Sequence, residues 1–203
     1  MQRRNALQGL MTGAAVLSAT AFLAACQPAK TKLEGIDITG AAYGKNWALS
    51  DAHGQKRTIG DFAGKVVVVF FGFTQCPDVC PTTLQELAEA KAMLGAQSDK
   101  LQGIFVTVDP ERDTPQVLRA YTEAFDPAMV ALTGSLEQIE AVAKDFKVFF
   151  KKVPGKLPGT YSVDHSAGIY MYDTQGQLRA YHRYGQGAAA LAKDAKALLG
   201  ETA

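Results

Sequence analysis

The chain has 203 residues, of which 47% are hydrophobic and 20% are charged, and its formal net charge at pH 7 is +1. These values are typical of one globular domain with a sizeable hydrophobic core. The near balance of 21 basic and 20 acidic residues argues against a strongly charged partner, and we expect no nucleic acid among the partners.

Residues 1–25 have the pattern of an export signal. Arg3 and Arg4 precede an apolar stretch from Leu7 to Phe22, which is followed by Leu23-Ala24-Ala25-Cys26. The last four residues resemble the bacterial lipobox, which implies that Cys26 is lipidated and becomes the first residue of the mature protein. An ordinary signal cut nearby and an uncleaved anchor helix remain alternatives, but the apolar stretch is short for the ~20 residues that span a membrane.

Removal of this signal changes both the charge and the meaning of the cysteines. Loss of Arg3 and Arg4 leaves 19 of the 21 basic residues against 20 acidic ones, so the formal charge moves from +1 to −1. If Cys26 carries lipid, Cys76 and Cys80 remain as an isolated pair. An exported compartment is oxidising, so an external reductant must open any disulfide in this pair. We expect a lipoprotein of the bacterial cell envelope, anchored in a membrane, with the inner membrane favoured, and facing the periplasm.

After the signal, residues 26–45 are polar and contain glycine, and we expect them to link the lipid to a domain of residues 46–203. Runs of β-branched and aromatic residues between turn signals predict the strands of that domain. In chain order the expected strands are Trp47–Ser50, Lys56–Ile59, Lys65–Phe73, Gly103–Val108, Val130–Leu132, Val148–Lys152, Ile169–Tyr172 and Gln177–Arg183. The third is an almost unbroken apolar run, which suits a central strand that is buried on both faces.

Helical spacing of apolar residues predicts helices between and after these strands. One begins after Cys80-Pro81 and stops near Gly95. Thr114 is the expected N-cap of the next helix, and Ser135 with Gln138 forms a capping box for the third. Ala188–Leu199 is the last helix. This order predicts an α/β thioredoxin-like fold, in which a central mixed sheet with an N-terminal β-hairpin extension is flanked by helices.

Cys76 and Cys80 follow the central strand, and each stands directly before a proline. The N-terminus of a helix favours thiolate over thiol, and a thiolate both attacks disulfides and binds soft metals. A spacing of four residues places both sulfurs on one helical face. That arrangement suits a metal clamp and, after local unwinding, also allows a Cys76–Cys80 disulfide. Two thiolates leave a soft ion under-coordinated, so a third ligand is expected.

His165 is the best candidate for this third ligand. It is expected in a loop immediately before a strand, and loops at strand ends converge near the site of an open α/β sheet. His53 is expected in a surface turn, and His182 at the surface or edge of a strand. Two further acids stand beside the ligands. Asp78 can stabilise the helix start or orient a ligand, and Asp164 can orient His165 or only fix its loop.

Three segments together resemble the Sco/SenC family: Gly72–Pro81, Val108–Pro115 and Tyr161–Ser166. The resemblance runs from about Trp47 to the final helix, and it implies a thioredoxin-like, membrane-tethered copper protein. Better-known members use a transmembrane helix where we expect a lipid here. Residues 109–115 match the family, but a capped turn after a strand explains much of this segment, and no chemical role follows from it.

The resemblance implies that Cys76, Cys80 and His165 bind copper, as Cu(I) or Cu(II). It also implies a metallochaperone that delivers copper to the binuclear copper centre of cytochrome c oxidase during its assembly. The implied partners are the copper-centre subunit of the oxidase, an upstream copper donor and a thiol reductant. A thiol–disulfide oxidoreductase, which reduces cysteines of the oxidase copper site or acts in redox sensing, needs only Cys76 and Cys80. A peroxidase is a third possibility on such a fold.

Overall fold

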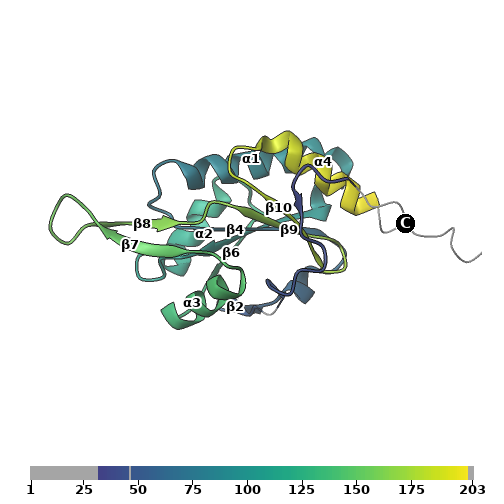
Figure 1. Cartoon of the computed structure of the whole chain (residues 1–203). Helices are drawn as coiled ribbons and strands as arrows, with labels where there is room; N and C mark the ends of the chain where they lie inside the picture. The colour runs from purple at the N-terminus through teal and green to yellow at the C-terminus, as the bar shows by residue number, and fades with distance from the viewer. Residues whose placement is uncertain (1–31, 46, 201–203) are drawn as a thin grey trace, which may run out of the picture. The chain divides into compact units, whose positions relative to one another are not determined.

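The computed structural model describes residues 32–45 and 47–200 of the chain (Figure 1). The expected signal peptide of residues 1–25, Cys26 and most of the expected linker lie outside the described residues. Within the two described ranges, no helix has both the length and the apolar character that crossing a membrane requires.

Eight strands of the described residues form one mixed sheet in the order β1-β10-β9-β4-β5-β6-β2-β3. These strands are β1 (Ile36–Asp37), β2 (Leu49–Asp51), β3 (Lys56–Arg57), β4 (Val66–Gly72), β5 (Leu101–Thr107), β6 (Val130–Thr133), β9 (Ile169–Tyr172) and β10 (Leu178–His182). Strand β5 is parallel to its neighbours β4 and β6, and the other neighbours are antiparallel. Both β4 and β5 are buried along their whole length, as predicted for central strands. The antiparallel pair β2–β3 at the edge is the expected hairpin extension.

Four α-helices of the described residues pack on this sheet. They are α1 (Val79–Met93), α2 (Pro115–Glu123), α3 (Leu136–Asp145) and α4 (Gly187–Gly200), with short 3-10 helices at Ile59–Phe62 and Gly95–Lys100. Helices α1 and α4 lie side by side over one face of the sheet, and α3 lies on the opposite side (Figure 1). Thr114 and Ser135 cap α2 and α3 as predicted, each accepting a hydrogen bond from the backbone N–H three residues later. The α/β thioredoxin-like architecture is therefore confirmed.

A two-stranded sheet extends from the body of the domain as an arm (Figure 1). Strands β7 (Phe150–Pro154) and β8 (Tyr161–His165) pair in antiparallel register, with Phe150 opposite His165. His165 therefore ends a strand and does not lie in a loop, because the pairing with β7 continues to this residue. The tip of the arm, residues 155–160, is exposed.

Residues 33–45 pack on the domain, although the sequence suggested a linker. Strand β1 pairs with β10 in this segment. The backbone N–H groups of Glu34 and Gly35 donate hydrogen bonds to the Asp194 carboxylate at 2.8 and 2.9 Å. The folded unit accordingly starts at Leu33 and not at residue 46. The contacts of residues 34–37 with β10 and α4 set this boundary. The local composition of the segment does not indicate such distant contacts.

The prediction of a surface or edge position for His182 is wrong. Strand β10 lies between β1 and β9, and the His182 side chain is fully buried against α4. Its Nε2 atom lies 3.0 Å from Oδ2 of Asp194, which is also fully buried. Gly35 lies directly against the ring, since a Cβ at this position would come within 2.8 Å of Nε2. His53, in contrast, lies in an exposed turn as predicted.

Candidate metal centre

Cys76, Cys80 and His165 come together although His165 is 85 residues from Cys80 in the chain. Among the described residues they form the group of three metal-ligating side chains whose donor atoms lie within 4.8 Å of one another. Cys76 lies in the loop after β4. Cys80 lies in the first turn of α1, which begins at Val79 and thus slightly earlier than expected. His165 ends β8, so three separate elements meet at the carboxyl end of the central strand.

Cys80 is the fully buried member of this group of three ligands. Burial raises the pKa of its thiol, and this effect outweighs a backbone hydrogen bond from Phe73 that lowers the pKa. The expectation that the helix start favours a thiolate is therefore wrong for Cys80, since desolvation dominates at this position. In the metal-free protein Cys80 is a protonated thiol, and it becomes a ligand when a metal ion displaces the proton.

Cys76 is half-buried, whereas Cys80 is buried. Its Sγ atom accepts a hydrogen bond from the backbone N–H of Cys80 at 3.4 Å. Both cysteines are free thiols in this structure, and the Cys76–Cys80 disulfide stays a prediction. Of the two cysteine residues, Cys76 is therefore the more exposed.

The His165 imidazole is oriented for binding through Nε2. Its Nδ1 atom lies 3.0 Å from the backbone oxygen of Ser166, which accepts a hydrogen bond if the proton is on Nδ1. That tautomer makes Nε2 the unprotonated nitrogen, which lies 3.4 Å from the Cys80 sulfur and accepts a hydrogen bond from its thiol. Burial is the main cause that lowers the pKa of His165, against opposing contributions from Ser166 and Asp164. The ring is therefore neutral at pH 7, as a metal ligand must be.

Two aromatic rings surround the imidazole. The ring of Phe73 lies edge-on at 5.8 Å between centroids, and that of Phe70 lies at 6.1 Å. Both phenylalanines are buried, so they exclude water from one side of the group. Two thiols and one imidazole in an apolar setting form a soft donor set, which fits Cu(I) or zinc and does not fit magnesium or calcium.

The two acids predicted to assist the ligands are exposed and lie outside the group of three. Asp78 is the N-cap residue of α1, but its side chain accepts no capping hydrogen bond. Asp164 precedes His165 in β8, and the structure links it to the site through its charge, which acts to raise the pKa of His165. The orienting roles proposed for both acids stay predictions.

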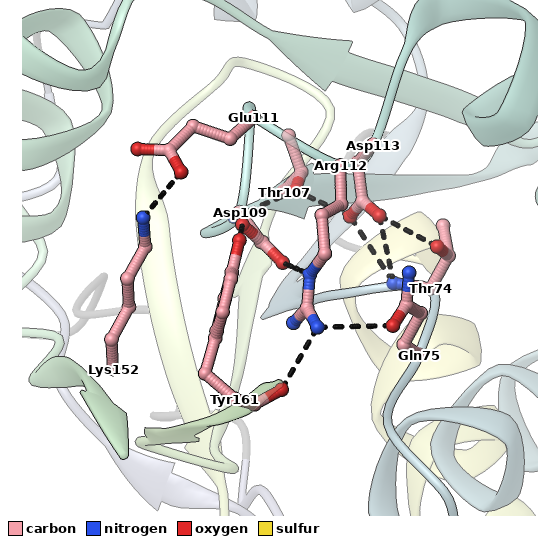
Figure 2. A network of polar contacts seen from close by, with 9 residues as sticks. All are labelled: Thr74, Gln75, Thr107, Asp109, Glu111, Arg112, Asp113, Lys152 and Tyr161. Atoms are coloured by element: carbon pink, nitrogen blue, oxygen red, sulfur yellow. Dashed lines mark hydrogen bonds and ion pairs between the residues drawn. The ribbon is translucent and has the colours of Figure 1, made fainter. Parts of the chain in front are cut away.

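A polar network that the sequence did not predict connects this site to the loop after β5 (Figure 2). The buried Asp113 carboxylate accepts hydrogen bonds from the Thr74 hydroxyl and the Thr107 hydroxyl, each at 2.6 Å. Arg112 reaches both the side chain of Gln75 and the backbone oxygen of Tyr161. Residues 109–115 match the family segment for which we found no chemical role. One signal in the sequence could have indicated this network. Strands β4 and β5 are parallel neighbours, so the loops that follow their carboxyl ends lie close together.

Gly72, the last residue of β4, leaves room for the buried thiol. A Cβ here would lie 2.7 Å from the Cys80 sulfur and 2.8 Å from the Phe105 ring. We expect Gly72→Ala to lower the free energy of unfolding by about 1–3 kcal/mol, as overpacking does, and to displace the sulfur and weaken metal binding. Urea denaturation and a metal-competition titration measure the two effects. In the control Gly60→Ala the nearest atom, Thr58 Oγ1, is 3.6 Å away. Equal losses in both variants would contradict this account of Gly72.

The fold and the site together define a class: a thioredoxin-like protein with two thiols and an imidazole gathered at the carboxyl end of its central strand. A model of the SCO1/SenC family matches residues 37–200. The chain belongs to the SCO1/SenC family.

Individual proteins are similar to the chain at the level expected within one family. The mitochondrial SCO2 homologue of Mus musculus is 38% identical over 145 residues, which are 70% of this chain and 57% of that protein. The solved structure of Bradyrhizobium japonicum ScoI with copper bound is 37% identical, with a TM-score of 0.67 over 80% of this chain and 97% of that one. BsSco, described as a Sco-family member of the cytochrome c oxidase assembly proteins with a disulfide switch, is 22% identical over 82% of this chain and 97% of that one. Its TM-score is 0.61, and at this identity it shows the fold alone.

The chain spans about half the length of the first curated relatives that it matches. Those relatives include mitochondrial and bacterial proteins, such as the SCO2-like protein of Rickettsia felis. Similarity over this shared domain supports the fold and the family of the chain. The activity of the chain has to be inferred from its own metal centre.

Proposed function

We propose that the protein is a copper metallochaperone in which Cys76, Cys80 and His165 bind copper as cargo. The observation that carries this proposal is the approach of three soft ligand atoms to within 4.8 Å, with His165 Nε2 directed at the Cys80 sulfur. Copper bound to B. japonicum ScoI supports the choice of metal. Cu(I) suits two thiolates and an imidazole, whereas Cu(II) asks for a further oxygen or nitrogen donor.

The proposed receiver is the binuclear copper centre of cytochrome c oxidase during its assembly. The resemblance to the SCO1/SenC family supports this receiver. Delivery requires an upstream copper donor and a reductant that keeps Cys76 and Cys80 as thiols. We further propose that lipid on Cys26 anchors the protein at the periplasmic face of a bacterial inner membrane. An anchor there would hold the domain at the same membrane as the oxidase.

A second candidate function is reduction of the oxidase cysteines, and the half-exposed Cys76 favours it. The Cys76 thiolate would attack a disulfide of the partner and form a mixed disulfide. The Cys80 sulfur would then displace the partner's thiolate, which leaves a Cys76–Cys80 disulfide here and two reduced cysteines on the partner. Two electrons pass to the partner in this exchange. His165 has no necessary part in it.

One comparison separates the two functions. The comparison uses cells that express the wild type, Cys76→Ala or His165→Ala. We expect the oxidase to contain less copper in the cells with either variant, because each substitution removes a copper ligand of the proposed chaperone. The measurement is the copper content of the purified oxidase, with the level of each variant checked by immunoblot. Loss of copper only in the cysteine variant would support thiol reduction and contradict delivery. Failure of the purified wild-type protein to bind one equivalent of copper would also contradict the proposal.

A further inference from the structure

His165 is the ligand whose position the main sheet does not fix. Cys76 and Cys80 are held by the end of β4 and the start of α1, both parts of the body of the domain. His165 belongs to the arm, whose two strands hydrogen-bond to each other in a separate sheet. The Phe70 ring of β4 packs against the imidazole at 6.1 Å, but this apolar contact has no fixed direction, so contacts between the arm and the loop of the thiols also set the distance between the imidazole and the two sulfurs.

The Arg112 side chain supplies such a contact, because it touches both the loop of the thiols and the arm of the histidine (Figure 2). Its Nη1 atom donates to the backbone oxygen of Tyr161 at 2.8 Å and to Oε1 of Gln75 at 3.0 Å. Its guanidinium carbon lies 3.7 Å from the centre of the Tyr161 ring and 5.8 Å from that of Phe73. Gln75 directly precedes Cys76. One side chain thus bridges the two parts of the metal site.

Arg112 is itself held in a fixed orientation. Its Nε atom donates to Oδ2 of Asp109 at 2.5 Å, and Asp109 is fully buried. The other oxygen of this carboxylate accepts a hydrogen bond from the Tyr161 hydroxyl at 2.8 Å, so Asp109 also contacts the arm. Asp113 fixes the far end of the same loop to Thr74, the residue before Gln75. A planar guanidinium with fixed donor directions keeps such a geometry better than a flexible ammonium group does.

The bridge acts on the histidine through β8. Tyr161 and His165 are the first and last residues of this strand, so the strand transmits the position of one to the other. The guanidinium of Arg112 also lies near the Phe73 ring, which packs edge-on against the imidazole at 5.8 Å. Arg112 therefore reaches the imidazole through two routes, the strand β8 and the Phe73 ring.

Two other links between arm and body are less able to do this. Lys152 of the arm pairs with Glu111 at 2.5 Å, but the two side chains are 41% and 56% exposed, and exposed pairs contribute little. Val163 is buried against the core and seats the arm by apolar contact, which has no preferred direction.

We propose that Arg112 is a positioning residue that sets the place of His165 relative to the two thiols. This inference rests on the proposed metal-binding function and gives the loop of residues 109–113 a role in it. Without Arg112, Cys76 and Cys80 keep their places and still bind Cu(I), while the imidazole leaves the coordination sphere. The effect on the metal is then that of losing one nitrogen ligand and no sulfur ligand.

The test compares Arg112→Ala with the matched control Arg119→Ala in the full-length purified protein. Arg119 lies on α2 and is 50% exposed, with Glu123 as its ion-pair partner at 3.9 Å, so the control removes the same charge far from the bridge. In the reduced, metal-free protein, we expect Arg112→Ala to lose the nuclear Overhauser contacts between the rings of Phe73 and His165. After anaerobic loading with Cu(I), X-ray absorption should show both sulfur ligands and no imidazole, as in His165→Ala. Affinity for Cu(I) should fall by about tenfold or more, the size of effect known for groups that orient a ligand.

Arg112→Lys serves as a second variant in case Arg112→Ala does not fold. Lysine keeps a cation beside Asp109, but it has no planar guanidinium to bridge Gln75 and Tyr161. We expect it to fold and to weaken the imidazole signal. Unchanged ring contacts and unchanged imidazole ligation in either variant would overturn the positioning role. If the wild type binds no Cu(I), the proposed function fails, while the ring contacts in the metal-free protein still decide the role of Arg112.

Discussion

Replacement of Cys80 by serine is expected to weaken Cu(I) binding on the order of 100-fold, with little loss of secondary structure. A hydroxyl group is a hard donor that keeps its proton at pH 7, so it does not replace a thiolate on a soft ion. Structural zinc sites with four ligands supply about 10–16 kcal/mol of binding free energy, so one ligand contributes about 3 kcal/mol, and we take the same size for a ligand of Cu(I). This loss corresponds to about 100-fold in affinity. A competition titration with a Cu(I) chelator under anaerobic conditions measures it.

A matched control exists on the same helix. Thr83 is as deeply buried as Cys80 and lies three residues further along α1, outside the group of ligands. Thr83→Ser removes one methyl group, and we expect its copper affinity to equal that of the wild type. If Cys80→Ser folds and binds Cu(I) as tightly as the control does, Cys80 is no ligand. In that case the site would have to consist of Cys76 and His165 alone.

The second large effect is expected at Asp194, which lies far from the thiols in the chain and is fully buried beside His182. Its carboxylate also accepts the backbone N–H groups of Glu34 and Gly35. Asp194→Ala leaves the two backbone donors without an acceptor and removes the buried carboxylate that lies 3.0 Å from His182 Nε2. Breaking a buried pair in this way costs about 3–5 kcal/mol, so we expect a loss of this size in the free energy of unfolding, together with release of residues 33–45. Urea denaturation and hydrogen exchange of β1 measure the two results.

Lys193, the neighbouring residue on α4, gives the control. It is exposed and pairs with the side chain of Glu34. Because an exposed pair of this kind contributes little, Lys193→Ala should leave stability near that of the wild type and β1 protected. A loss as large in Lys193→Ala as in Asp194→Ala would mean that helix charge, and not the buried carboxylate, holds the N-terminal segment.

The contribution of Asp194 should depend on pH. Burial alone would raise the pKa of this carboxyl, but the contact with His182 and the N–H groups of Glu34 and Gly35 outweigh it and hold the pKa below its usual range. A carboxyl whose pKa is lower in the folded state stabilises the fold above the pKa of the unfolded chain, about 3.9. This stabilisation is lost as the pH falls through the lower, folded-state pKa. The difference in unfolding free energy between the wild type and Asp194→Ala should therefore shrink below about pH 4, and a constant difference down to pH 2 would contradict this account.

Local signals in the sequence predicted most elements of the fold, whereas strands β1 and β8 were not predicted. The apolar run that forms β4 has no polar residue to place in water, so burial on both faces follows from composition alone. The caps at Thr114 and Ser135 depend on residues three positions away, which the sequence displays directly. Three features depend on partners that are distant in the chain: the order of the strands in the sheet, the start of the domain at Leu33 and the end of β8 at His165. The sequence indicated the order of the strands only in outline.

The metal site divides in the same way. The ligand types and the strand–thiol–helix order could be predicted, because they follow from residue identity and spacing. That Cys80 is a buried, protonated thiol and that His182 faces Asp194 could not be predicted, since desolvation depends on what packs around a group. The bridge of Arg112 between Gln75 and Tyr161 belongs to this second kind. Its three residues are far apart in the chain, and only the parallel pairing of β4 and β5, together with the docking of the arm, brings them together.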